Sequence, residues 1–160
     1  MGCGCRGQEL GRRLVSAGWQ TRGTTRDPSD AEDILAAGLE AVVADPDRVA
    51  SILDQVGDVA VVFWLLGSAV GEPEAVAAIH GSRLERLMEK LVDTPVRGFV
   101  YEAAGRVPQP ELERGAAIVR EAADRWRIPV EVVTGDPADW EAWTEAMLAA
   151  AERLTGARQS

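Results

Sequence analysis

The 160-residue sequence predicts one α/β domain over residues 1–160: a doubly wound parallel sheet with helices on both faces, whose first β-strand is missing or truncated. Short β-type segments alternate with helical segments, which is typical of parallel strands joined by helical crossovers. The run Val59–Leu66 is continuously apolar, as expected for a strand that helices cover on both faces. A glycine-rich loop, GCGCRG, follows Met1 directly, although such a loop normally comes after a strand.

Hydrophobic periodicity and turn residues define the individual elements. A first helix is expected over residues 7–17, because Leu10, Leu14 and Val15 share one face and Gly18 can end it. The expected strands are residues 19–25, 39–44, 58–66, 95–101 and 129–133. The further expected helices are residues 28–37, 47–56, 73–91 with a break near His80–Gly81, 111–126 and 139–154.

Composition excludes several classes of function. A net charge of −9, from 26 acidic and 17 basic residues without a basic stripe, disfavours nucleic-acid binding. No apolar run approaches the ~20 residues that cross a membrane, and no signal peptide is visible, so we expect a cytoplasmic protein with no membrane partner. Cys3 and Cys5 are better explained as loop residues than as metal ligands, because His80 is the single histidine and no ligand set results. His80 itself is interpreted as structural or exposed rather than catalytic.

Gly2, Gly4 and Gly7 match the pattern G-x-G-x-x-G of a dinucleotide-binding loop. In this interpretation Gly2 permits the tight turn, Gly4 lets a pyrophosphate approach the main chain, and Gly7 lets the helix pack closely on the sheet. The helix start would then offer free N–H groups and a positive dipole end to the phosphates. The alternative is a helix that merely begins with glycines.

If the missing strand is counted as the first, residues 19–25 form the second strand of such a fold, and Thr25 and Arg26 stand at its end. A site that prefers NAD usually has Asp or Glu at this point. A hydroxyl and a guanidinium suit the 2′-phosphate of NADP, so NADP is favoured and NAD is the alternative. Arg26 could instead be a surface arginine paired with Asp27 or Asp30. Two other arginines are secondary phosphate candidates: Arg6 and the weaker Arg22.

Five segments carry a resemblance to the short-chain dehydrogenase/reductase superfamily, in its extended or atypical branches, including NmrA-like NADP-binding proteins. These segments are GCGCRG, GWQTRGTTRDP, GLEAVVADP, DVAVVFWLLGSA and PVRGFVYEAAG. The resemblance covers nearly the whole chain. It implies a Rossmann-like fold and a nicotinamide dinucleotide as cofactor and partner.

The resemblance also implies roles for individual residues. Asp45, with Pro46 beside it, would contact the adenine, although Asp45 also suits a helix cap and the two roles are compatible. Leu65, Leu66 and Gly67 would line the cofactor from the end of a strand. The complete expected cofactor site is Gly2, Gly4, Cys5, Arg6, Gly7, Thr25, Arg26, Asp45, Pro46, Leu65, Leu66 and Gly67.

The catalytic pattern of that superfamily is not present. Its enzymes use a tyrosine followed four residues later by a lysine, whereas the single tyrosine, Tyr101, is followed by Gly105 at that spacing. The single lysine is Lys90, and Ala103 and Ala104 stand where serines are typical. The catalytic residues therefore stay unassigned.

The functional expectation is an NAD(P)-binding protein that acts as a reductase or is epimerase-like, with Glu102 and Tyr101 as candidate acid–base groups. The alternatives are a non-enzymatic NADPH-sensing protein and a remnant with little cofactor affinity. A substrate pocket would be small, absent or shared with a second subunit of a homo-oligomer. We further expect the natural chain to begin upstream of Met1, and Met1–Arg6 to be the least well anchored part of the site.

Overall fold

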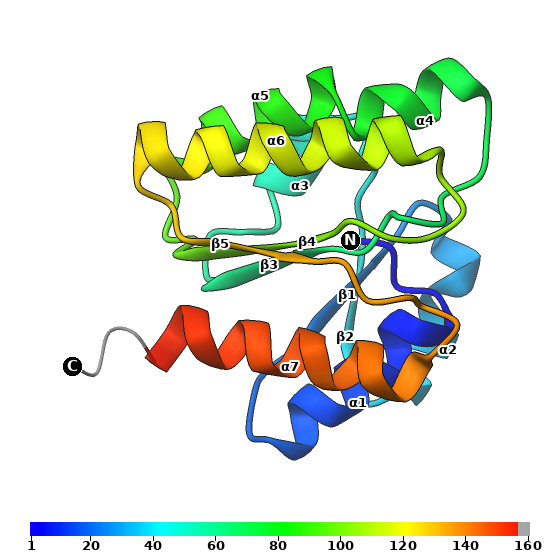
Figure 1. Cartoon of the computed structure of the whole chain (residues 1–160). Helices are drawn as coiled ribbons and strands as arrows, with labels where there is room; N and C mark the ends of the chain where they lie inside the picture. The colour runs from blue at the N-terminus through cyan, green and yellow to red at the C-terminus, as the bar shows by residue number, and fades with distance from the viewer. Residues whose placement is uncertain (157–160) are drawn as a thin grey trace.

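A computed structural model describes residues 1–156, which form helices packed on parallel strands (Figure 1). The strands are β1 (Arg22–Thr25), β2 (Glu40–Val43), β3 (Val61–Trp64), β4 (Gly98–Glu102) and β5 (Val130–Val133). The helices are α1 (Cys5–Ser16), α2 (Ala31–Ala36), α3 (Val49–Leu53), α4 (Pro73–Ile79), α5 (Ser82–Leu91), α6 (Gln109–Trp126) and α7 (Trp140–Gly156), with a 3-10 turn, η1 (Pro28–Asp30), before α2.

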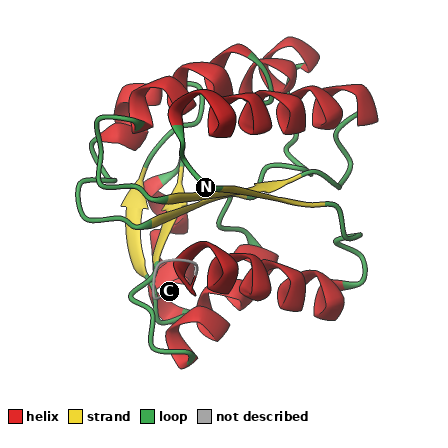
Figure 2. Cartoon of the chain, turned by 60° about the vertical axis from the view of Figure 1, so that its left-hand side comes forward, coloured by secondary structure: helices red, strands yellow, loops and turns green. Residues whose placement is uncertain are grey.

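The helices cover both faces of the strands, as predicted for a doubly wound fold. Helices α3, α4, α5 and α6 lie on one face, and α1 and α7 lie on the other (Figures 1 and 2). All strand pairs are parallel, with the register Thr25↔Val43 between β1 and β2 and Trp64↔Tyr101 between β3 and β4. Within residues 1–156 the strands form two sheets, β1–β2 and β3–β4–β5, rather than one continuous sheet.

The predicted order of elements is confirmed, and the largest differences are at the ends of strands. The long helix breaks at His80–Gly81 as expected, so that α4 and α5 are separate. Strand β1 begins at Arg22 rather than at residue 19, because its partner strand begins at Glu40. Strand β4 continues through Glu102, one residue beyond the expected end, which places this carboxyl group at the edge of the sheet.

Strand β4 is the centre of the larger sheet, and all five of its residues are buried. Alternate side chains enter opposite halves of the core, as the pleat of a strand requires. Phe99 packs in the cluster that includes Leu87 of α5, whereas Val100 packs in the cluster that includes Met147 of α7. Apolar packing on both faces therefore fixes the carboxyl ends of β3, β4 and β5.

Met1 lies in the gap between the two sheets. Its ammonium donates a 2.7 Å hydrogen bond to the Phe63 carbonyl, and its own carbonyl accepts one of 3.0 Å from the Leu65 amide. The Thr24 hydroxyl, from β1, donates to the Met1 sulfur at 3.2 Å. The expectation that Met1–Arg6 is the least anchored part of the site is therefore wrong at Met1, which contacts both sheets.

Burial of the Met1 ammonium gives the fold a pH dependence. Loss of solvation lowers the pKa of this amine from 8.0 to about 6, so between these values the unfolded chain binds a proton that the folded chain does not. The free energy of unfolding is expected to fall by about 2–3 kcal/mol as the pH drops from above 8 to below 6. Chemical denaturation across this range measures the change. A chain acetylated at its α-amino group should lack this component, and an unchanged profile after acetylation would contradict it.

Candidate functional site

The glycine loop lies at the carboxyl ends of β1 and β3, and two of its glycines are required by the fold itself. Gly2 has φ +82°, and a Cβ there would overlap the main-chain carbonyl of Leu65. A Cβ on Gly7 would lie 2.8 Å from the Gly2 oxygen, inside contact distance. These two positions let the chain turn out of the gap and let α1 pack closely on the loop.

Gly4 differs from its two neighbours in the motif. It has the ordinary extended angles φ −79° and ψ −162°, which any residue adopts. A Cβ added to it would meet no atom of residues 1–156 within 4 Å. Neither the backbone nor the packing of the described chain requires glycine here, so the space above Gly4 is open to a ligand.

The start of α1 faces the same open space with its amide groups uncapped. Gly4 is the N-cap residue, and its carbonyl accepts the first helical hydrogen bond, from the Gln8 amide at 2.8 Å. Within the described residues no side chain caps this end, and the first turn holds no acidic residue. The arrangement leaves N–H groups and the positive end of the helix dipole available to an anion.

Arg26 follows β1 and is held by two aspartates that follow β2. Its Nε lies 3.5 Å from Asp45 Oδ1 and its guanidinium 3.6 Å from Asp47 Oδ2, with about half of the arginine side chain exposed. The alternative expectation is that Arg26 pairs with Asp27 or Asp30. It is wrong about the partners, because the ion pairs of Arg26 are to other aspartates. The parallel register of β1 and β2 brings Arg26 to Asp45 and Asp47 instead.

Thr25 and Asp45 both have local structural roles at this end of the sheet. The Thr25 hydroxyl donates to the Asp27 carbonyl at 3.1 Å. Asp45 Oδ1 accepts the Asp47 amide at 2.9 Å, and Pro46 between them is buried. Asp45 thus orders the turn before α3, while its carboxylate remains beside Arg26. The alternative interpretation of Asp45 as a helix cap is wrong, because Arg48 is the N-cap residue of α3 and no side chain of the described residues caps that helix.

The other expected loop residues, Cys5 and Arg6, and the further phosphate candidate Arg22 lie in different parts of the structure. Cys5 is exposed, and Arg6 reaches toward α7, where its guanidinium lies 5.9 Å from the centroid of the Trp143 ring. Arg6 and Arg26 therefore lie on different sides of the loop. Arg22 is at the amino end of β1 and donates to Asp58 at 2.8 Å, so the expectation that it contacts a phosphate is wrong.

Glu102 organises the carboxyl end of β4 and is almost completely buried. Its Oε1 accepts a 2.8 Å hydrogen bond from the Gly67 amide, and its Oε2 accepts one of 2.8 Å from Trp143 Nε1. Burial raises the pKa of the Glu102 carboxyl above its usual range, against the effects of these donors and of the Arg6 charge. Glu102 therefore ties the end of β3 to α7.

Tyr101 and His80 form a second buried link behind this edge. The Tyr101 hydroxyl lies 2.6 Å from His80 Nδ1, and His80 Nε2 lies 2.9 Å from the Leu66 carbonyl. Because a carbonyl only accepts, Nε2 carries the proton and Nδ1 accepts from the tyrosine. Burial raises the pKa of Tyr101 and lowers that of His80. Neither ring is exposed, so both act in holding Leu66 and β4 in place.

Gly67 and Gly105 bring the loops after β3 and β4 into contact. A Cβ added to Gly67 would overlap the Ala104 carbonyl. Gly105 has φ +143°, and a Cβ added to it would overlap the Gly67 carbonyl. The Val107 amide donates to that Gly67 oxygen at 2.9 Å. The carboxyl edge of the larger sheet is therefore rigid, with the Leu65–Gly67 segment fixed beside the glycine loop.

Two kinds of feature are not found in the part of the chain that the structure describes. No helix within residues 1–156 combines the length and apolar character needed to cross a membrane. Among the same residues, no three His, Cys, Asp or Glu side chains group in a way that could hold a metal ion.

Comparison with known proteins shows the fold. No protein-family model and no curated protein matches the chain. Among solved structures, gox2253 is similar with a TM-score of 0.66 and 19% identity over 82% of this chain and 48% of that one. A UDP-glucuronic acid 4-epimerase from Bacillus cereus, solved with NAD, gives 0.63 at 12% identity over 82% and 53%. A Citrobacter triphenylmethane reductase complexed with NADP(H) gives 0.57 at 14% identity over 78% and 44%.

The chain shares their fold. At these sequence identities the likeness extends to the fold alone, in which helices flank parallel strands. The chain spans about half the length of each of these proteins.

Proposed function

We propose that the chain binds a nicotinamide dinucleotide, with NADP preferred to NAD, across the carboxyl ends of β1 and β3. The observation that carries this proposal is the open space above Gly4, at the uncapped start of α1. In folds of this class a pyrophosphate approaches the main chain at the middle glycine of the loop. Two of the similar structures hold NAD and NADP(H), respectively, which supports the same ligand class here.

The pyrophosphate would be held mainly by main-chain groups. The free N–H groups that follow Gly4 and the dipole of α1 provide directional donors and positive potential. Arg6, extending over Trp143 of α7, adds a positive charge next to the loop. This position favours contact with the pyrophosphate over contact with the adenosine 2′-phosphate, which would lie by β1.

The preference for NADP rests on Arg26. Its guanidinium is half exposed, and its contacts to Asp45 and Asp47 are long, at 3.5 and 3.6 Å. A 2′-phosphate would offer shorter, charge-assisted hydrogen bonds to the same group. The two aspartates oppose this by repulsion, so the preference depends on the balance between one guanidinium and two carboxylates.

The reaction class that fits best is that of a reductase or an epimerase-like protein, in which the bound cofactor supplies a hydride. Tyr101 and Glu102, the candidate acid–base groups, are buried and hydrogen-bonded to other protein groups. Their burial favours a second function, in which the chain binds NADPH as a sensor without turnover. A screen with aldehydes, ketones and nucleotide sugars that follows both NADPH oxidation and sugar interconversion separates the two. A reductase oxidises NADPH, an epimerase-like enzyme interconverts the sugar with no net use of cofactor, and a sensor does neither.

Replacing Arg26 with alanine should weaken NADPH binding about tenfold or more while changing NADH binding less than about twofold, because only NADPH carries the 2′-phosphate. Asp47→Asn should have the opposite sign and tighten NADPH binding severalfold by removing one repulsive charge. Energy transfer from tryptophan to the reduced nicotinamide measures both affinities.

Arg48→Ala serves as the matched control, since Arg48 is an exposed arginine in the same region. It should leave the ratio of NADPH to NADH affinity unchanged. Equal losses of both cofactors in Arg26→Ala would exclude the 2′-phosphate assignment. Absence of saturable binding of either cofactor below about 1 mM would exclude the proposed function as a whole.

A further inference from the structure

We propose that Arg106 and the hydroxyl group of Ser68 hold the carboxylate of a short aliphatic oxo acid, which is the carbonyl substrate of this chain. This inference rests on the proposed function, because it assigns a substrate class to the same site. Ser68 follows β3 and Arg106 follows β4, at the carboxyl edge of the larger sheet. The 2′-phosphate end of the dinucleotide would lie by β1, so its nicotinamide end would lie on this other side of the glycine loop.

The main chain at Arg106 is held in place, whereas its side chain is exposed. The Arg106 amide donates to Ser68 Oγ at 3.2 Å, and the next amide, of Val107, donates to the Gly67 carbonyl at 2.9 Å. The Val107 side chain is buried, and Gly105 packs against Gly67 without a Cβ between them. These contacts fix the base of the exposed Arg106 side chain beside the expected cofactor segment.

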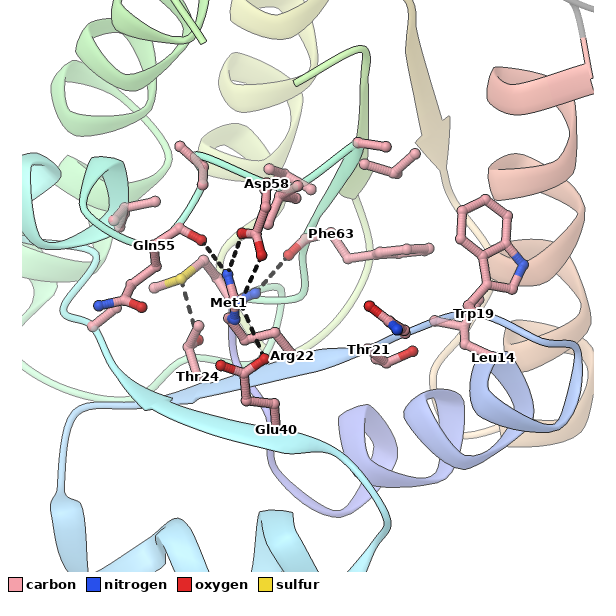
Figure 3. Close-up of a pocket in the computed structure, with 18 of the residues that line it drawn as sticks. Met1, Leu14, Trp19, Thr21, Arg22, Thr24, Glu40, Gln55, Asp58 and Phe63 are labelled. Atoms are coloured by element: carbon pink, nitrogen blue, oxygen red, sulfur yellow. Dashed lines mark hydrogen bonds and ion pairs between the residues drawn. The ribbon is translucent and has the colours of Figure 1, made fainter. Parts of the chain in front are cut away.

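Arg106 is an unpaired cation in a chain of net charge −9. Other arginines near the strand ends are neutralised by carboxylates. Arg22 lies between Asp58 and Glu40 (Figure 3), and Arg26 contacts two aspartates. Within residues 1–156, no carboxylate forms an ion pair with the Arg106 guanidinium. Its five N–H donors are therefore available to an anion from outside the chain.

The Ser68 hydroxyl provides a second donor next to this guanidinium. Its oxygen accepts the Arg106 amide, and in the described part of the chain its hydrogen has no acceptor. A guanidinium fork and a hydroxyl proton match the two oxygens of a carboxylate. Because a single guanidinium is present rather than a cluster of cations, the pair suits one carboxylate better than a diphosphate.

Val70 indicates the apolar part of the ligand. It is 84% exposed, more than any other large hydrophobic residue within 1–156. It stands two residues after Ser68, in the loop between β3 and α4, and Gly71 with φ +150° turns the chain directly after it. A short aliphatic group placed against Val70 would remove apolar surface of both partners from water. The ligand is therefore a small carboxylate with an aliphatic body.

The reaction that fits this ligand is the reduction of its carbonyl group. The carbonyl carbon of the oxo acid accepts a hydride from NADPH, and the carbonyl oxygen accepts a proton from solvent, which gives the hydroxy acid and NADP⁺. Arg106 and Ser68 take no part in either transfer. They hold the carboxylate and so orient the carbonyl group, an anchor that a neutral ketone of the same shape lacks.

The test measures binding of 2-oxobutanoate to the ¹⁵N-labelled chain with saturating NADP⁺, which has no hydride to transfer, so no turnover occurs. NMR should show saturable shifts of the Arg106 side-chain Nε–H and of the Ser68 amide. The neutral ketone 2-butanone should bind at least tenfold more weakly, because it lacks the carboxylate. Arg106→Ala should weaken 2-oxobutanoate binding at least tenfold. Arg106→Lys should restore only part of it, because an ammonium does not provide the planar fork.

Arg120→Ala is the matched control. Arg120 is also exposed and has no ion pair among the described residues, but it lies about three turns into α6, away from the carboxyl edge. Its replacement removes the same charge and should change 2-oxobutanoate binding less than about twofold. The Tm of both alanine variants should stay within a few degrees of the unchanged chain, since both side chains are exposed.

Equal binding of 2-oxobutanoate and 2-butanone would overturn the inference, and so would unchanged binding by the Arg106→Ala chain. Saturable binding of NADP⁺ without any shift at Arg106 up to about 10 mM 2-oxobutanoate would overturn the inference and leave the proposed function intact. Shifts at Arg106 in a chain that binds no NADP⁺ would support the carboxylate site and contradict the proposed function.

Discussion

Replacing Glu102 with alanine is expected to lower the free energy of unfolding by about 3 kcal/mol, or roughly 10 °C in Tm for a chain of this size. The Gly67 amide and Trp143 Nε1 would each lose a buried acceptor, and both donors are enclosed by the core. Release of the desolvated carboxyl group offsets only part of this cost. Thermal and chemical denaturation measure the loss.

Two further substitutions test whether the loss of stability is specific to the two buried hydrogen bonds of Glu102. Glu102→Gln keeps the shape but places an N–H₂ group against one of the two donors, so its loss should be intermediate. Glu131→Ala removes a carboxylate of β5 whose Arg153 partner is more than half exposed, and it should cost less than about 1 kcal/mol. If Glu102→Ala were as mild as Glu131→Ala, the role of Glu102 in joining β3 to α7 would be contradicted.

Replacing Gly4 with serine is expected to weaken binding of both NADPH and NADH by more than tenfold while leaving Tm within a few degrees. Serine is a favourable N-cap residue and adopts the extended angles of Gly4, so the fold should tolerate it. Its side chain would occupy the open space where the pyrophosphate approaches. Parallel measurement of Tm and cofactor affinity separates a local block from unfolding.

Gly57→Ser is the matched control for this substitution. A Cβ added to Gly57 would also meet no described atom within 4 Å, and this glycine has no positive φ, but it precedes β3 at the opposite edge of the sheet. Both Tm and cofactor affinity should stay close to those of the unchanged chain. Unweakened cofactor binding by the Gly4→Ser chain would remove the main support for the proposed site.

The order of elements could be predicted because hydrophobic period and turn residues are local properties of the sequence. The break at His80–Gly81 illustrates this, since a glycine in a helical pattern signals the interruption. The ends of strands depend instead on their partners. Trp19 and Thr21 are residue types that favour a strand, yet β1 starts at Arg22, opposite the first residue of β2.

The position of the glycine loop before α1 could be predicted from the sequence, whereas most side-chain contacts of the candidate site could not. Proximity in sequence favours Asp27 and Asp30 as partners of Arg26, whereas the parallel register places Asp45 and Asp47 beside it. Glu102 was recognisable as a carboxyl group near a strand end. Its two donors are 35 and 41 residues away, so its structural role depends on how β3 and α7 pack.

The most direct test of dinucleotide binding at the glycine loop is NMR titration of the ¹⁵N-labelled chain with NADPH. We expect saturable shifts that are largest for the amides of Gly4, Cys5, Arg6 and Gly7, together with the Arg26 side chain. Shifts that do not include the amides of the loop, or no shifts up to about 1 mM NADPH, would contradict binding at the loop.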